Sequence, residues 1–163
     1  MNEKKRARVE QAEVETAERR QKAIVSLAHC LGRSDVYRLH HDVLVEEILL
    51  AGGSEHFTDT KKLRFAAYVC AWLAGLAAVI ERYQQLVSNG TLPSSEEMSR
   101  LVTPEYLDLL KPFRNAVAHC SDHDDDRLLD LLNTPNTTPD RAAEISEAFK
   151  RYFAQNSTRP IYS

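Results

Sequence analysis

The chain has 163 residues, of which 43% are hydrophobic and 28% are charged, values typical of one soluble globular domain. Its 21 lysines and arginines against 24 aspartates and glutamates give a net charge of −3, so binding to a nucleic acid would require a local basic site. The 5 glycines and 6 prolines are too few for a collagen-like or low-complexity protein.

The first predicted element is a long charged helix over residues 2–29, rich in glutamate, lysine, arginine, glutamine and alanine. Gly32 is expected to end this helix, and Ser34 to cap a second helix over residues 35–51. Residues 1–33 are therefore predicted to form a separate charged N-terminal helix.

The longest apolar run of the chain extends from Phe65 to Ile80 and lies within a predicted helix over residues 60–88. A membrane span needs roughly 20 apolar residues, and this run is shorter. A helix that is apolar on every side must nevertheless be buried. We expect it to be the central helix of a soluble protein, with a membrane span as the alternative.

Helix-start and helix-stop signals divide the remainder of the chain, and no strand pattern is present. The sequence therefore predicts an all-α antiparallel helical bundle with a long central apolar helix, spanning residues 34–155 and followed by a C-terminal tail over 156–163. The signals are Asn89-Gly90 as a helix end, a capping box at Ser94-Ser95-Glu96-Glu97, Thr103-Pro104 as a helix start, Pro112 as a break or a new start before Phe113–His119, Asp124–Asp126 before a short helix at 127–132, and Thr138-Pro139 before the last helix.

The spacing of the cysteines and the first residues of the chain indicate the cellular compartment of the protein. Cys30, Cys70 and Cys120 form no C-x-x-C pair, which favours neither a zinc ribbon nor a disulfide framework. The first residues lack the apolar segment of a signal peptide. We therefore expect a cytoplasmic protein with no membrane association.

Two clusters carry the polar chemistry, one from Arg33 to Asp42 and one from Arg114 to Asp126. No glycine-rich phosphate loop is present, and we expect no cofactor. In the second cluster His119 and His123 are four residues apart and carboxylates follow, which is one pattern for a metal site. The aspartates equally suit a helix cap, which would end the helix near His119, and our prediction contains no metal.

The segment Arg114-Asn115-Ala-Val-Ala-His119 resembles the R-x4-6-H motif of the HEPN superfamily (higher eukaryotes and prokaryotes nucleotide-binding). The context is similar as well, because apolar residues fill the interval and a long apolar helix ending in Ile80-Glu81-Arg82 precedes it. The resemblance covers residues 35–153 in layout and is specific at 113–119. It implies a small helical bundle, and many such proteins are metal-independent ribonucleases.

The resemblance also implies roles for particular residues. His119 would act as general base and acid, Arg114 would stabilise the phosphate, Asn115 would orient the imidazole, and Glu81 is an additional candidate that could pair with Arg114. Arg114 and His119 are about 140° apart around a helix axis, so they would not converge in one chain. In the family the motif helices of two protomers face each other, which implies a homodimer with a composite site.

The function expected from this resemblance is cleavage of single-stranded RNA by a metal-independent endoribonuclease of the toxin or antiviral-defence type. RNA, a second copy and an inhibitory protein are the expected partners, and the charged N-terminal helix is a candidate docking element for the inhibitor. The alternative is a catalytically inactive HEPN-like module that binds a partner protein or a nucleotide. A metal-binding regulator built on His119 and His123 is a third interpretation.

Overall fold

The computed structural model describes residues 3–119 and 138–158. Within these ranges the chain is helical and contains no strand, which confirms the predicted all-α fold. The elements are α1 (Glu3–Leu50), the 3-10 turn η1 (Ser54–His56), α2 (Asp59–Ser88), α3 (Glu96–Leu101), α4 (Pro104–His119) and α6 (Thr138–Asn156).

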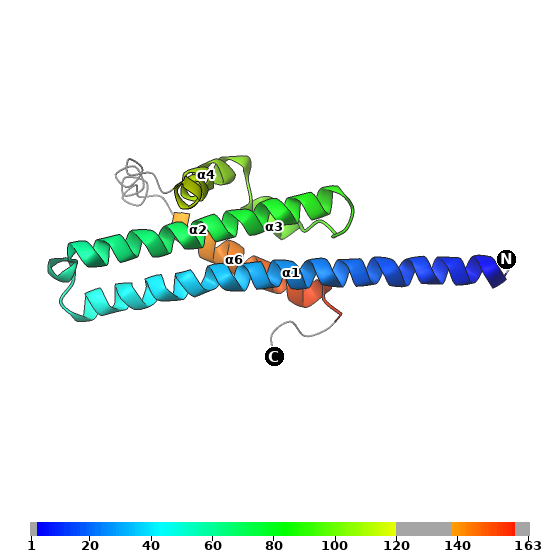
Figure 1. The fold of residues 1–163 in the computed structure, drawn as a ribbon, viewed down its shortest axis with the longest axis horizontal. Coiled ribbons are helices and arrows are strands. Elements are labelled where there is room, and N and C mark those ends of the chain that lie inside the picture. Colours follow the sequence, from blue (N-terminus) through cyan, green and yellow to red (C-terminus); the bar gives the residue numbers. More distant parts are fainter. Residues whose placement is uncertain (1–2, 120–137, 159–163) are drawn as a thin grey trace.

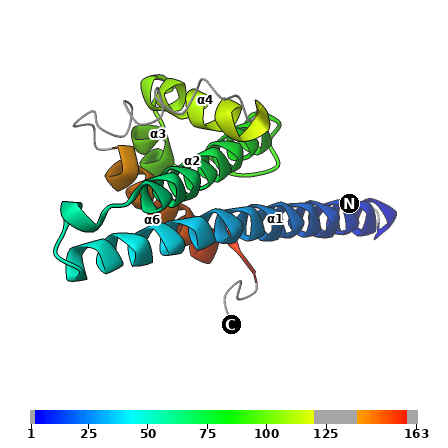
Figure 2. The ribbon, with the colours of Figure 1, turned by 60° about the vertical axis from the view of Figure 1, so that its left-hand side comes forward.

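Helices α1 and α2 form an antiparallel hairpin, with α4 against α2 and α6 packed along the pair (Figure 1). A second view shows the same order, with α2 between α1 and α4 (Figure 2). The predicted central apolar helix is therefore α2, which begins and ends within one residue of the expected bounds. Of the helices in the described ranges, α2 is the one long and apolar enough to cross a membrane, a test that the core helix of a soluble protein also passes.

One continuous core joins the helices. Leu73, Leu76 and Ile80 of α2 are fully buried, and they meet apolar side chains from α1, α4 and α6. Burial of a large apolar side chain contributes roughly 1.5–3 kcal/mol. The core therefore depends on α2, and its other large members are Ile24, Leu27, Leu31, Tyr106, Leu110, Phe113, Phe149 and Phe153.

The predicted break at Gly32 is wrong, because α1 runs without interruption from Glu3 to Leu50. Ser34 is not an N-cap. It is buried, and its hydroxyl donates to the carbonyl of Trp72 in α2 at 2.8 Å. A glycine inside a helix costs about 1 kcal/mol relative to alanine, which is less than the helix gains by burying Leu31 and Leu44 on either side of it. The predicted boundary after residue 33 falls inside this helix.

The predicted ends of α2 agree with the structure. Thr58 caps its N-terminus by accepting a hydrogen bond from the backbone N–H of Lys61. Gly90 ends it with a φ of 75°, a left-handed conformation that favours glycine, and the N–H of Thr91 returns to the carbonyl of Leu86. These contacts turn the chain sharply back towards α3.

Helices α3 and α4 follow the predicted starts, with one shift and one error. Ser95, not Ser94, caps α3, and Thr103 caps α4 by accepting from the N–H of Tyr106. Pro112 does not break the chain, because α4 continues through it to His119. A proline inside a helix costs about 3 kcal/mol. Burial of Leu110 and Phe113 on the same helix offsets this cost.

Helix α6 closes the bundle as predicted, with Ala142, Ile145, Phe149 and Tyr152 buried on one face. The Tyr152 hydroxyl donates to the carbonyl of Pro93 at 2.8 Å, which fixes the α2–α3 connection against α6. The predicted short helix at 127–132 lies outside the described residues.

The N-terminal part of α1 extends well beyond the bundle (Figures 1 and 2). Every described side chain from residue 7 to residue 20 is exposed. Gln21, which follows these residues, contacts the bundle, because its side-chain amide donates to Ser157 and accepts from the backbone N–H of Thr158 just after α6. Residues 7–20 are hereafter the N-terminal arm.

Candidate functional site

The motif residues lie on the C-terminal half of α4. Tyr106, Leu110 and Phe113 form the buried face of this helix, and Arg114 and Asn115 are exposed. His119 is the last residue of α4. Because α4 is continuous, positions 115 and 119 are one turn apart on the same side of the helix.

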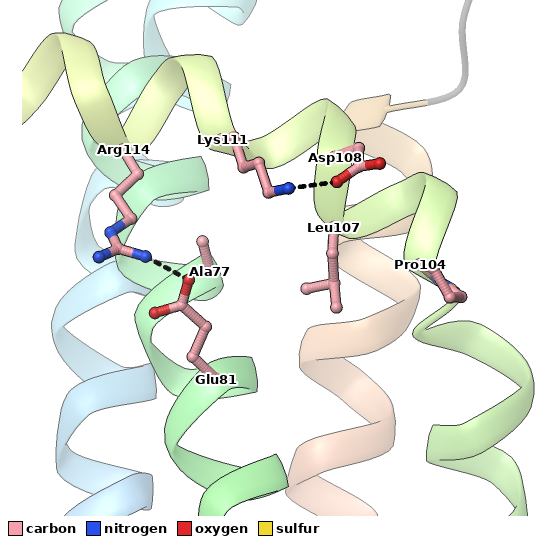
Figure 3. Close-up of a pocket in the computed structure, with 7 residues that line it drawn as sticks. All are labelled: Ala77, Glu81, Pro104, Leu107, Asp108, Lys111 and Arg114. Carbon is pink, nitrogen blue, oxygen red and sulfur yellow. Dashed lines mark hydrogen bonds and ion pairs between the residues drawn. The ribbon is translucent and has the colours of Figure 1, made fainter.

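Arg114 is held by α2. Its guanidinium forms an ion pair and hydrogen bond with the carboxylate of Glu81, one turn beyond Ala77 on the α2 face that meets α4 (Figure 3). Both side chains are about half-exposed, so the pair contributes little to stability. Its effect is to orient the guanidinium, and this is the contact that the sequence suggested for Glu81.

A shallow pocket of about 200 Å³ lies beside this pair. Ala77 and Leu107 give it apolar walls, while Lys111 and Asp108 form a second ion pair at the rim (Figure 3). The remaining lining residues are Glu81, Pro104 and Arg114. The pocket therefore combines an apolar interior with two cationic side chains, each of which is paired with a carboxylate.

The structure brings Arg114 to Glu81, on the side of α4 that faces α2. Arg114 reaches towards α2, whereas positions 115 and 119 lie about 100° and 140° further round the axis of α4. One copy of the chain thus presents the arginine and the histidine position of the motif in different directions.

The metal interpretation of this region lies mostly outside the described residues, because His123 and Asp124–Asp126 belong to the segment 120–137. Among residues 3–119 and 138–158, no group of three histidine, cysteine, aspartate or glutamate side chains is placed to hold a metal ion.

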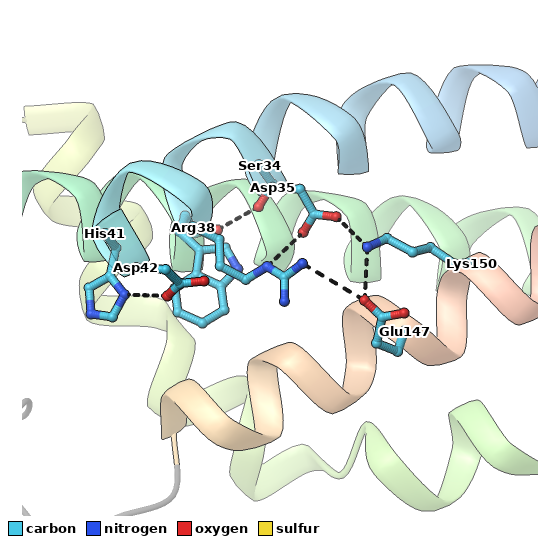
Figure 4. A network of polar contacts seen from close by, with 8 residues as sticks. Ser34, Asp35, Arg38, His41, Asp42, Glu147 and Lys150 are labelled. Atoms are coloured by element: carbon cyan, nitrogen blue, oxygen red, sulfur yellow. Dashed lines mark hydrogen bonds and ion pairs between the residues drawn. The ribbon is translucent and has the colours of Figure 1, made fainter. Parts of the chain in front are cut away.

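The other cluster, Arg33 to Asp42, joins two helices. Asp35 accepts from Lys150 of α6 at 2.9 Å, and Arg38 lies between Asp35 and Glu147 at 3.5 and 3.8 Å (Figure 4). The hydrogen bond from Lys150 lowers the pKa of Glu147. Burial opposes the charge of Lys150, but its bonds to Glu147 and Asp35 outweigh this effect and raise its pKa. This network holds α6 against α1, and no spacing in the sequence identified the two α6 partners.

The histidines of that cluster pack against α2. His40 stacks on Tyr68, with ring centroids 5.3 Å apart. The ring centroid of His41 lies 4.9 Å from that of Phe65 and 6.0 Å from that of Trp72. The side chain of His41 is therefore largely covered by these rings.

Comparison of the chain with protein-family models, with curated proteins and with solved structures finds no match. The fold is thus established by the structure, and the resemblance of residues 113–119 to the HEPN motif stays a prediction.

Proposed function

We propose that this protein is a metal-independent endoribonuclease of the toxin or antiviral-defence type, which cleaves single-stranded RNA at a site completed by a second copy of the chain. The observation that supports this proposal most is the anchoring of Arg114 by Glu81 on a helix that continues unbroken to His119. A phosphate-binding cation is thereby held next to an accessible pocket and one and a half turns from a general base.

The proposed reaction is an internal transesterification. The imidazole of His119 removes the proton from a ribose 2′-hydroxyl, and the 2′-oxygen attacks the adjacent phosphorus. The bond to the 5′-oxygen of the next nucleotide breaks, and that oxygen takes up a proton from a protonated histidine. Arg114 stabilises the negative charge that develops on the non-bridging oxygens. The products carry a 2′,3′-cyclic phosphate and a 5′-hydroxyl.

A second copy supplies what one chain lacks. The outer face of α4, with positions 115 and 119, points away from Arg114, so a single chain cannot direct both groups at one phosphate. If two α4 helices meet across a two-fold axis, the histidine of one copy can act as base and that of the other as acid. Asn115, one turn before His119, would orient the imidazole.

The test is cleavage of a 5′-labelled single-stranded RNA by the full chain in excess EDTA. Arg114→Ala, Asn115→Ala and His119→Ala are each expected to lower the rate, with His119→Ala the most severe. Arg82→Ala is the matched control, because Arg82 is an exposed arginine next to Glu81 that bonds Gln85 instead. Equal rates for Arg82→Ala and Arg114→Ala would refute the assigned role of Arg114.

A second candidate function is a helical module without catalysis that binds a partner protein or a nucleotide in the pocket. The apolar walls of that pocket, Ala77 and Leu107, favour it, since a binding site needs apolar surface that a ligand can cover. A toxin would normally be held in check by an inhibitory protein, and the charged N-terminal part of α1, which includes the N-terminal arm, is the candidate docking element for it. Intact RNA with the wild type would favour the module.

A further inference from the structure

The outer face of α1 carries an apolar stripe that is exposed among the residues the structure describes. Val36, Leu39, Val43 and Leu50 are 51%, 62%, 46% and 81% exposed. They are three, four and seven residues apart, so they align along one side of the helix. We call these four residues the α1 stripe.

The α1 stripe is separate from the face that packs into the bundle. Ser34 and Leu44 are buried against α2, and they lie well round the helix from Leu39 and Val43. Both views show this end of α1, coloured cyan, with α2 on one side and no other described helix on the opposite side (Figures 1 and 2). The stripe therefore faces away from α2 and from α4 beyond it.

Val36, Leu39 and Val43 follow the three-then-four spacing of the seam of a two-helix coiled coil. The next seam position is Glu46, and Leu50 lies one heptad beyond Val43. Single exposed leucines are common on protein surfaces, but an aligned set marks an interaction site. This spacing therefore fits a partner that packs on the α1 stripe as an α-helix.

The charged residues near the α1 stripe favour a second α1 helix as its partner, running in the antiparallel direction. Arg33 lies about one turn before Val36, and Glu46 and Glu47 lie between Val43 and Leu50, all of them exposed. A second α1 running antiparallel would place its Arg33 next to these glutamates, at both ends. Parallel pairing would place like charges together, which is unfavourable. With the two-fold axis beside Leu39, Val36 of each copy would face Val43 of the other.

We propose that the α1 stripe is an interface at which two copies of this chain pair through antiparallel α1 helices. This interface is independent of the proposed nuclease site, because it lies on the other side of the bundle from α4. A chain that also pairs through α4 would form an assembly larger than a dimer, since each copy would then have two self-complementary faces.

The first test is the particle mass of the full chain, measured by light scattering or sedimentation. Leu39→Glu places a charge at the centre of the interface and is expected to raise its dissociation constant by about a hundredfold or more. The mass should fall to half or less, whether or not α4 also pairs. Leu63→Glu is the matched control, because Leu63 is 66% exposed on α2 outside the stripe. Circular dichroism confirms that both variants remain helical.

The second test addresses direction. Arg33→Glu should weaken the assembly, and adding Glu46→Arg and Glu47→Arg to the same chain should restore it, because the unlike pairs are then exchanged. A wild type that is monomeric throughout the micromolar range, or a mass that Leu39→Glu leaves unchanged, would overturn the proposal. Failure of the triple variant to recover would overturn the antiparallel arrangement. None of these outcomes depends on RNA cleavage.

Discussion

The close approach of α1 and α2 can be tested by replacing two glycines with valine, because one glycine lies where the helices meet and the other does not. A Cβ atom on Gly75 of α2 would lie 3.0 Å from the Cβ and 3.1 Å from the hydroxyl oxygen of Ser34. A Cβ atom on Gly32 of α1 would meet nothing within 4 Å. Both glycines lie inside helices, so Gly75→Val and Gly32→Val differ chiefly in packing.

The expected effects have opposite signs. Valine has a higher helix propensity than glycine by a few tenths of a kcal/mol, which should make Gly32→Val neutral or slightly stabilising. At Gly75 the same side chain must push α1 away from α2. Overpacking of this kind costs typically ~1–3 kcal/mol, so a net loss of about 2 kcal/mol is expected. For a chain of this size, that corresponds to a Tm lower by roughly 4–8 °C.

Thermal and urea unfolding of both variants, followed by circular dichroism, measure the difference. If Gly32 ended the helix, as the sequence suggested, and did so in the left-handed conformation that glycine adopts at helix ends, Gly32→Val would be strongly destabilising. That result, or a Gly75→Val variant as stable as Gly32→Val, would refute the continuous α1 and its close approach to α2 through Ser34.

Three further predictions concern the cap of α4, the α6 network and the motif ion pair. Thr103→Ala removes the acceptor for the N–H of Tyr106 and should cost about 1 kcal/mol of unfolding free energy in urea titrations. The pKa of Glu147 is lowered from its usual 4.5 by the hydrogen bond from Lys150, so its contribution to stability is complete above that value and is lost as the pH falls through the folded pKa. Glu147→Gln should therefore flatten the acid limb of the stability profile below pH 4.5, and an unchanged limb would contradict the assignment. Glu81→Gln should change stability by less than about 1 kcal/mol, because the pair is half-exposed, yet slow RNA cleavage by on the order of tenfold to a hundredfold, since Arg114 loses its anchor. A variant that is both stable and fully active would show that the anchor is dispensable.

The helical fold was predictable because local signals and tertiary packing agree along most of the chain. The caps at Thr58 and Thr103 and the end at Gly90 are set by residue chemistry within one turn, and the structure has each of them. The apolar run in α2 identified the central helix for the same reason, since its composition requires burial.

The errors arose where tertiary packing outweighs local preference. Gly32 and Pro112 are helix breakers in isolation, but each lies between residues that the bundle buries, and that burial exceeds the local cost. Ser34 has the chemistry of a cap and instead bonds Trp72 on another helix, which a local pattern cannot reveal.

The candidate site was predictable only in part. The sequence suggested that Glu81 could pair with Arg114, and the structure has this ion pair. The pocket beside the pair and the links from α6 to Asp35 depend on how separate helices meet, so no single segment encodes them.

Metal-independent transesterification at the end of α4 is tested most directly by the chemical ends of the RNA products. The full chain is incubated with a defined single-stranded RNA in excess EDTA, beside His119→Ala, and the products are analysed by mass spectrometry. Fragments with 2′,3′-cyclic phosphate and 5′-hydroxyl ends are expected for the wild type only. Intact RNA in both samples, or products with 3′-hydroxyl and 5′-phosphate ends, would contradict it.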